Sequence, residues 1–380
     1  MAGDKMTMGS FFSPFTINDL TLPNRSVRSA VWEGMADDDG RVTPRLVDTM
    51  VRLARNRVGL IITGHAYVHP AGKASPWQVG VYSDDMLDGL KKMADAVHDA
   101  DGRLCLQLAH AGGHAATRLT HHQALGPSAF MGRFGEMCRA MSVADIQTLL
   151  EAIASAARRA QAAGCDAVQI HAAHGYLLSQ FLSPATNHRQ DAFGGSLENR
   201  ARLVCEAIRV VRAAVGAGFP ILIKINSEDF VEAGFQQDDM LRVAALLADA
   251  GVDAVEMSGG TVINPQETHC ARKAHPTRPE EEVYYREAAQ AFKAAVALPL
   301  ILVGGIRSLA MAEQLIADGT ADLIAFGRPL ISEPGLIRRW QSGNRKISAC
   351  ISCNRCYVPL EAGQGVSCVV ASERHQRKPR

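Results

Sequence analysis

The chain has 380 residues, of which 47% are hydrophobic and 21% are charged, so it can bury a large core and is not a disordered chain. Its 40 basic and 39 acidic residues nearly cancel, which excludes an electrostatic footprint for nucleic acid or for an anionic membrane. No apolar run approaches the ~20 residues of a membrane span, and the N-terminus lacks the pattern of a secretion signal. We therefore expect a cytoplasmic protein whose partners are small molecules; a homo-oligomer is compatible with this composition.

Short apolar runs recur along the chain, and each is followed by a segment with helical periodicity. We expect eight strands, at 27–31, 58–63, 103–108, 166–171, 220–226, 253–257, 299–303 and 322–326. We expect helices at 45–56, 84–100, 143–163, 198–217, 238–250, 281–296, 308–317 and 332–342. Several strands are apolar at consecutive positions, as parallel strands covered on both faces are. The pattern predicts an α/β fold, a (β/α)8 TIM barrel, rather than a doubly wound sheet, because no GxGxxG opens the first helix.

The barrel prediction has a consequence for function, because catalytic residues of such barrels follow the carboxyl ends of the strands. Residues that end or follow the expected strands are His65, Gln107, His110, His171, His174, Tyr176, Gly304, Gly305, Gly327 and Arg328, and Lys224 lies within the fifth strand. We expect all of them at one mouth of the barrel.

Two glycine motifs follow the last two strands, VGGI at 303–306 and AFGRP at 325–329. Glycine N–H groups and a helix N-terminus often bind phosphate at this place in barrels, and Arg328 would reinforce the site. Ordinary tight turns are the alternative for either motif alone. With a phosphate there, Lys224 could stabilise the anionic reduced form of an electron-accepting ring and Gln107 could hydrogen-bond the ring edge, roles that suit FMN. Lys224 could instead be neutralised by an acid inside the barrel.

His171 and His174 stand three residues apart in the loop after the fourth strand, with Tyr176 close behind. Two such donors could polarise a carbonyl oxygen, and the tyrosine could supply a proton. A zinc pair of HxxH type is one alternative, although the sequence offers no matching third ligand. A structural role for either histidine is another.

The stretch HAAHGYLLSQFLSPATNHRQDAFGGSLENR at 171–200 resembles the signature of the Old Yellow Enzyme family of NADH:flavin oxidoreductases. Further stretches agree in the same order: LPNR at 22–25, GLIIT at 59–63, LQLAHAGG at 106–113, KINSEDF at 224–230, VGGIRS at 303–308 and AFGRPLISEP at 325–334. The resemblance covers about residues 10 to 345. It implies FMN held without a covalent bond, reduction by NAD(P)H, and hydride transfer from flavin N5 to the β-carbon of an activated alkene.

The resemblance also implies roles for individual residues. Ser29, Ala30 and Val31 would line the flavin through their backbone, and His65 would lie beside it. Gln107 would meet the pyrimidine edge of the flavin and Lys224 its N1/O2 side. The phosphate would be bound by Gly304, Gly305, Gly327 and Arg328. His171 and His174 would hold the substrate's carbonyl oxygen, and Tyr176 would protonate the α-carbon. Trp32 departs from the family, whose members often have Thr or Cys there.

Nine cysteines are unevenly distributed. Five are single and are expected to be small core residues: Cys105, Cys138, Cys165, Cys205 and Cys270. The other four form a C-x2-C-x2-C-x11-C pattern, which is the spacing of a metal or iron–sulfur site: Cys350, Cys353, Cys356 and Cys368. It resembles the [4Fe-4S] segment of the larger relatives, the 2,4-dienoyl-CoA reductase and trimethylamine dehydrogenase type. Zinc and free or redox-active thiols are the alternatives.

The sequence therefore predicts two parts, an FMN-binding barrel at 1–345 and a Cys-rich tail at 346–380. The expected function is NAD(P)H-driven reduction of the C=C bond of α,β-unsaturated carbonyl or related electrophilic compounds. Two alternatives stay open: a flavin/iron–sulfur dehydrogenase or demethylase of a small amine or ether, and an electron-transfer subunit of a larger reductase.

Overall fold

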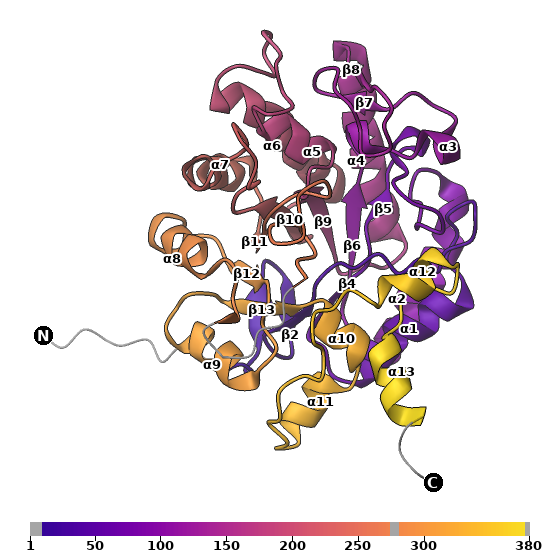
Figure 1. Ribbon diagram of the computed structural model, residues 1–380, viewed down its shortest axis with the longest axis vertical. Helices are drawn as coiled ribbons and strands as arrows, with labels where there is room; N and C mark the ends of the chain where they lie inside the picture. The colour runs from indigo at the N-terminus through magenta and orange to yellow at the C-terminus, as the bar shows by residue number, and fades with distance from the viewer. Residues whose placement is uncertain (1–9, 274–280, 377–380) are drawn as a thin grey trace, which may run out of the picture.

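The computed structural model describes residues 10–273 and 281–376, and eight parallel strands close a barrel in it (Figure 1). The strands are β3 Ser26–Arg28, β4 Leu60–Ile62, β6 Leu104–Ala109, β9 Ala167–Ala172, β10 Ile221–Asn226, β11 Ala254–Ser258, β12 Leu300–Val303 and β13 Leu323–Phe326. Each pairs with the next along the chain, and β13 pairs with β3 to close the circle. The predicted TIM barrel is confirmed, and every predicted strand overlaps an observed one.

A layer of helices covers the outside of the barrel (Figure 1). It consists of α1 Pro44–Arg55, α2 Leu87–His98, α4 Val143–Ala162, α6 Leu197–Val215, α7 Gln237–Ala250, α8 Arg286–Ala295, α9 Leu309–Ala317 and α11 Leu336–Gln341. Ser142 and Asp145 form a capping box that starts α4. Gly251, at φ 98°, takes the left-handed conformation that ends α7.

Two helix predictions were wrong in detail. The helix expected at 332–342 is divided into α10 (Arg328–Ser332) and α11, because Pro334 cannot continue a helix and favours extended backbone before it. The helix expected to begin at residue 281 begins only at Arg286, because Val283 has a φ of 70°, outside the helical region.

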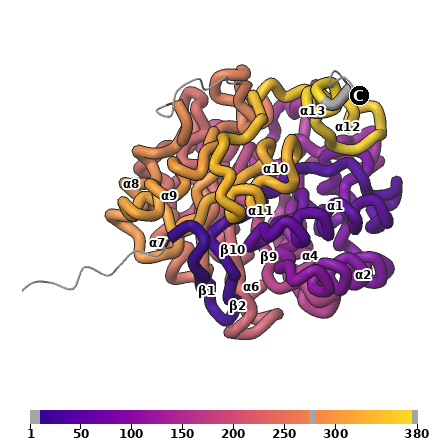
Figure 2. Tube along the Cα trace, turned by 90° about the horizontal axis from the view of Figure 1, so that it is seen from below, coloured from indigo at the N-terminus to yellow at the C-terminus, as the bar shows by residue number. Residues whose placement is uncertain are grey.

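The interior of the barrel is apolar in its lower half, at the amino-terminal ends of the strands, and polar in its upper half, at their carboxyl ends. A hairpin of β1 (Phe15–Ile17) and β2 (Leu20–Leu22), which the sequence analysis did not predict, packs Ile17 and Leu22 onto the inward-facing apolar residues at the lower end. Figure 2 shows this hairpin at the end of the molecule opposite to the C-terminal segment. The polar side chains inside the barrel therefore collect at the upper mouth.

The Cys-rich tail packs on the barrel near this mouth. It contains α12 (Tyr357–Glu361) and α13 (Val369–Gln376), which lie beside α1 in both views (Figures 1 and 2). Leu360 is fully buried with its side chain against Gly34, and Val366 N–H donates to Glu33 O at 2.7 Å. The tail is thus attached to the barrel along much of its length. No helix within the described ranges is long and apolar enough to cross a membrane.

Candidate active site

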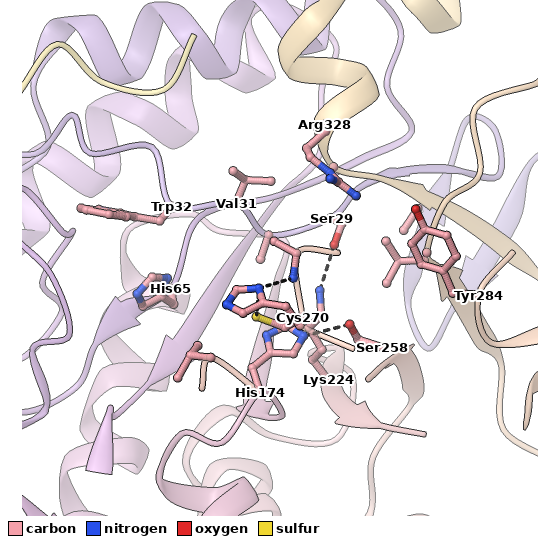
Figure 3. A pocket seen from close by; sticks show the side chains of 18 of the residues that line it. Ser29, Val31, Trp32, His65, His174, Lys224, Ser258, Cys270, Tyr284 and Arg328 are labelled. Atoms are coloured by element: carbon pink, nitrogen blue, oxygen red, sulfur yellow. Dashed lines mark hydrogen bonds between the residues drawn. The ribbon is translucent and has the colours of Figure 1, made fainter. Parts of the chain in front are cut away.

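A cavity of about 400 Å³ opens at the upper mouth of the barrel (Figure 3). The structure brings all of the predicted flavin-binding and catalytic residues to its lining: Ser29, Ala30, Val31, His65, Gln107, His171, His174, Tyr176, Lys224, Gly304, Gly305, Gly327 and Arg328. They come from seven of the eight strands or from the loops that follow them, and only β11 contributes none of them. Trp32 also lines the cavity, and its indole Nε1 is buried without a hydrogen-bond partner among the described residues.

The floor of the cavity is a buried chain of charged and amide side chains. Lys224 Nζ lies 2.9 Å from Glu256 Oε1, which also accepts the Ser29 hydroxyl at 2.6 Å. The other carboxylate oxygen of Glu256 accepts from Gln169 Nε2 at 2.8 Å, and Gln169 Oε1 accepts from Gln107 Nε2 at 2.7 Å. Glu256 and Gln169 are fully buried, and Lys224 is 2% exposed. An acid inside the barrel does neutralise Lys224, although the lysine still lines the cavity.

This chain of hydrogen bonds fixes the orientation of Gln107. A carboxylate only accepts, so Glu256 requires the amide nitrogen of Gln169, which leaves the Gln169 oxygen to face Gln107. Gln107 must then donate its own nitrogen toward Gln169. Its carbonyl oxygen remains as an acceptor for a ligand. The interior acid therefore determines which hydrogen-bonding group Gln107 offers, two residues away.

His171 and His174 lie together, with ring centroids 5.1 Å apart. His174 has a φ of 65°, its N–H donates to Asn226 Oδ1 at 3.1 Å, and its Nε2 lies 2.8 Å from Ser258 Oγ. His171 Nδ1 is buried and has no hydrogen-bond partner among the described residues. Burial, followed by the neighbouring cationic and imidazole groups, holds the pKa of both well below the usual value. Both are therefore neutral at pH 7 and can offer an N–H to an oxygen without carrying charge.

The zinc alternative for this pair gains no support. Among the described residues, no group of three or more His, Cys, Asp or Glu side chains is arranged to hold a metal ion. The two neutral imidazoles are instead placed to donate hydrogen bonds to a carbonyl oxygen in the cavity.

Tyr176 lies next to the two histidines, with its ring 5.2 Å from His171 and 5.5 Å from His65. Burial raises the pKa of Tyr176, and the charge of Arg133 opposes this shift. Burial and then Arg133 lower the pKa of His65 to about 3. The tyrosine is therefore protonated at pH 7 and stands among neutral imidazoles.

The opposite end of the cavity carries the glycine motifs. Gly304 (φ 131°) and Gly305 (φ 76°) lie in conformations that favour glycine, and an added Cβ would come within 2.8 Å of the Tyr285 ring or 2.6 Å of the Tyr284 ring. Gly327 is not required in this way, since a Cβ there would meet only Val31, at 3.5 Å. The close approach of backbone and aromatic rings at the first two positions suits a site where main-chain N–H groups face a ligand.

Arg328 has a second role that the sequence did not indicate. Its Nη1 donates to Arg272 O at 2.7 Å, to Ser352 O at 3.1 Å and to Asn354 Oδ1 at 2.7 Å. Arg307 Nη1 similarly donates to Cys350 O at 3.2 Å. The arginines at the expected phosphate end therefore also attach the Cys-rich tail.

The four cysteines of the tail line one small cavity together: Cys350, Cys353, Cys356 and Cys368. Backbone N–H groups point at two of their sulfurs, from Ser352 to Cys350 Sγ and from Ala371 to Cys368 Sγ. Burial raises the pKa of Cys356 to about 11, so as a free thiol it would be protonated and a slow nucleophile. Within residues 10–273 and 281–376, neither these cysteines nor any other group of three or more His, Cys, Asp or Glu side chains is arranged to hold a metal ion.

Of the five single cysteines, four are buried as expected, and Cys270 is the exception. It lines the active-site cavity beside His174 (Figure 3). Other cavity or floor residues that the sequence analysis missed are Arg133, Gln169, Glu256, Ser258, Tyr284 and Tyr285. Glu256 and Gln169 had a signal, since each is polar within an apolar strand run. Ser258 ends β11, and the others stand outside the barrel strands, where their position depends on the fold.

The comparisons with known proteins agree with this geometry. The model of the NADH:flavin oxidoreductase / NADH oxidase family matches residues 10–346. The chain is 36% identical over 351 residues to an NADH oxidase of Thermoanaerobacter brockii, covering 91% of this chain and 53% of that protein. A solved 2-naphthoyl-CoA reductase in complex with 2-naphthoyl-CoA matches with a TM-score of 0.88 at 26% identity, covering 95% of this chain and 56% of that one. An old yellow enzyme homologue from Zymomonas mobilis matches with a TM-score of 0.78 at 26% identity, covering 96% and 98%. The chain thus spans about half the length of the first curated relatives it matches.

Proposed function

The chain belongs to the NADH:flavin oxidoreductase / NADH oxidase family, the Old Yellow Enzyme family, and from this premise we propose that it reduces the C=C bond of electrophilic alkenes with electrons from NAD(P)H. Membership of the family implies FMN and NAD(P)H. The observation that carries the proposal is that one cavity is lined by a buried lysine, an oriented glutamine, two glycines with positive φ and two neutral histidines.

The residues of the cavity fit FMN. The glycine pair and Arg328 would hold the phosphate, Lys224 would lie at the N1/O2 side of the flavin, and the carbonyl oxygen of Gln107 would accept from its N3–H. When bound, FMN supplies the hydride from its N5 atom. The protein's contribution is to hold this group over a floor whose side chains are fixed by hydrogen bonds to one another.

The other residues act on the substrate. The N–H groups of His171 and His174 would bind the oxygen that activates the alkene and stabilise the negative charge that develops on it, because preorganised donors in a buried site need no rearrangement. The Tyr176 hydroxyl would deliver a proton to the α-carbon. His171 and Tyr176 are buried and His174 is half-buried, so water has limited access to the reacting atoms.

The amine or ether dehydrogenase alternative fits the charges less well. An ammonium substrate would lie among neutral histidines beside the cationic Arg133, which would repel it. The electron-transfer alternative does not use the histidine pair or Tyr176 at all.

The experiment is a stopped-flow study of the FMN-loaded protein with NADH, NADPH and cyclohexenone. We expect one or both nicotinamides to bleach the flavin and cyclohexenone to restore its absorbance. Inertness toward every activated alkene, with normal flavin reduction, would contradict the proposed reaction and favour the electron-transfer role.

A second proposal concerns the tail, which would hold a [4Fe-4S] cluster. It is supported by the four cysteines around one cavity and by the N–H groups directed at two sulfurs, a feature that tunes such clusters. Anaerobically purified protein should contain about four irons and matching sulfide per chain. Flavin absorbance alone, with no iron after anaerobic reconstitution, would exclude the cluster, and bound zinc would replace it.

A further inference from the structure

Arg133 projects into the substrate end of the cavity from a hairpin at 130–138. The hairpin is closed by Cys138 N–H donating to Phe130 O at 3.0 Å and by a bridge between Met131 and Met137. Its base is pressed against the Gly113 carbonyl so closely that a Cβ on Gly132 would come within 2.1 Å of it. This contact holds the following residue, Arg133, in a defined place over the cavity.

The contacts of Arg133 fix its side chain without neutralising it. Its backbone N–H donates to His114 Nδ1 at 3.2 Å, its Nη2 donates to Ala74 O at 2.5 Å, and its guanidinium lies 4.5 Å from the centroid of the Phe134 ring. Its Nε is buried without a hydrogen-bond partner. A guanidinium has five N–H donors, so most of them have no acceptor within the described part of the chain.

No acidic group balances this charge. Across residues 10–273 and 281–376, no Asp or Glu forms an ion pair with Arg133. The groups that respond to its charge are His65, His114, Tyr176 and Cys270, and each of them is neutral at pH 7. The other cations that line the cavity are engaged elsewhere: Lys224 pairs with Glu256, Arg307 lies 4.0 Å from Glu282, and Arg328 donates to Ser352 O and Asn354 Oδ1 of the tail. A partly buried cation among neutral groups favours an anionic ligand.

We propose that Arg133 binds a carboxylate of the substrate, so that the preferred substrates are electrophilic alkenes that carry a carboxylate apart from the oxygen bound by His171 and His174. The inference rests on the proposed function, because it assumes that the histidine pair binds the activating oxygen. The charge of Arg133 acts on Tyr176, and both residues line the same cavity as the histidine pair, so a substrate held by Arg133 and by the histidines would lie close to the tyrosine hydroxyl.

The test uses phenols as probes of the oxygen site, since phenolic ligands give a charge-transfer band over the flavin in this family. The FMN-loaded protein is titrated with 3- and 4-hydroxybenzoate and with their methyl esters, which keep the phenol but lack the negative charge. For at least one isomer we expect the acid to bind roughly 10 to 100 times more tightly than its ester, as a charge-assisted hydrogen bond would give. Arg133→Gln should abolish this preference, while Arg133→Lys should keep part of it.

Arg118→Gln is the matched control, because Arg118 is exposed and lies over the same Phe134 ring at 5.7 Å but does not line the cavity. It should leave the preference for the acid unchanged. FMN content and the flavin spectrum of all variants should equal those of the wild type, which shows that they fold.

Three outcomes overturn the inference. If acid and ester bind equally to the wild type, Arg133 does not select a carboxylate, while the proposed function stands. If Arg133→Gln weakens the binding of NADH or NADPH in the reductive half-reaction but not the binding of the acid, Arg133 binds the dinucleotide instead. If no phenol binds and no alkene is reduced, the proposed function fails as well.

Discussion

Replacing Glu256 by Gln should reveal how much the cavity floor depends on its interior acid. Glu256 is fully buried, and its two oxygens accept from Lys224, Ser29 and Gln169 at 2.6 to 2.9 Å. Glutamine has nearly the same shape but no charge. The substitution therefore leaves Lys224 in the barrel interior without a counter-charge while creating almost no cavity.

The size of the effect follows from that geometry. Removing one partner of a buried ion pair typically lowers the free energy of unfolding by ~3–5 kcal/mol, because the other charge stays buried and unpaired. The glutamine oxygen can still accept from Lys224, so we expect a loss near the lower limit, about 3 kcal/mol, from a total of roughly 5–15 kcal/mol. Urea unfolding of the FMN-free protein, followed by circular dichroism, measures it.

Bound FMN adds a second readout. With Glu256 neutralised, the charge of Lys224 is no longer offset, so it should favour the reduced flavin, which carries more negative charge. We expect the midpoint potential to rise by about 30 mV or more, a tenfold change in the relative affinity for the two flavin states. Gln169→Leu is the control: it interrupts the hydrogen bonds to Gln107 but leaves the ion pair, so FMN should bind more weakly with little change in potential. An unchanged unfolding midpoint together with an unchanged potential in Glu256→Gln would refute the reasoning.

Three further perturbations address the substrate side and the fold. Tyr176→Phe should leave FMN reduction by NAD(P)H intact and slow the oxidative half-reaction by ~10²–10⁴-fold, as for loss of a proton donor; equal rates in both half-reactions would remove the assigned role. Changing His171 and His174 together to Ala should abolish the charge-transfer band of bound phenols, and a retained band would mean that other groups bind the oxygen. The third perturbation is a decrease in pH. Burial lowers the folded-state pKa of four histidines, so the unfolded chain binds more protons below about pH 6.5 and stability falls as the pH drops through that value: His65, His171 and His174 in the cavity, and His114 outside its lining. Between pH 7.5 and pH 5.5, each histidine should lower the free energy of unfolding by about 1.4 kcal/mol, and the four together by about 5–6 kcal/mol. Urea unfolding midpoints measured across this pH range would detect the change. A midpoint that does not vary with pH would show that these histidines are solvated.

Much of the barrel and its mouth could be predicted because each depends on local sequence. A strand buried on both faces appears in the sequence as a short apolar run, and polar residues within or directly after that run indicate the functional end of the barrel. His65, Gln107 and Lys224 were found in this way, and all three line the cavity. The β1–β2 hairpin was missed because its strands have only three residues each, too short for a periodic signal.

The buried floor could have been predicted only with the register of the barrel. Lys224 and Glu256 are direct partners on neighbouring strands, as are Gln107 and Gln169. Both pairs hydrogen-bond through their side chains. Once the strands are aligned, a glutamate inside an apolar run must find a partner, since an unpaired buried charge is too costly. Arg133 offers no comparable signal: it lies in a loop, and its place depends on the contact of Gly132 with the Gly113 carbonyl.

The active-site cavity and the cavity of the four cysteines have lining residues in common, so the two proposed cofactor sites are neighbours. Arg328 and Cys350 line both the active-site cavity and the cavity of the four cysteines. Arg328 Nη1 holds Ser352 O and Asn354 Oδ1 of the tail while the same side chain faces the expected phosphate end. A phosphate there would restrain Arg328 and, through it, the loop that carries Cys350 and Cys353. Because coupling between two binding sites is reciprocal, whatever orders the tail should also favour the flavin. The active-site cavity is therefore lined in part by residues beyond the last barrel helix, namely Cys350, Ser352, Tyr357 and Glu361.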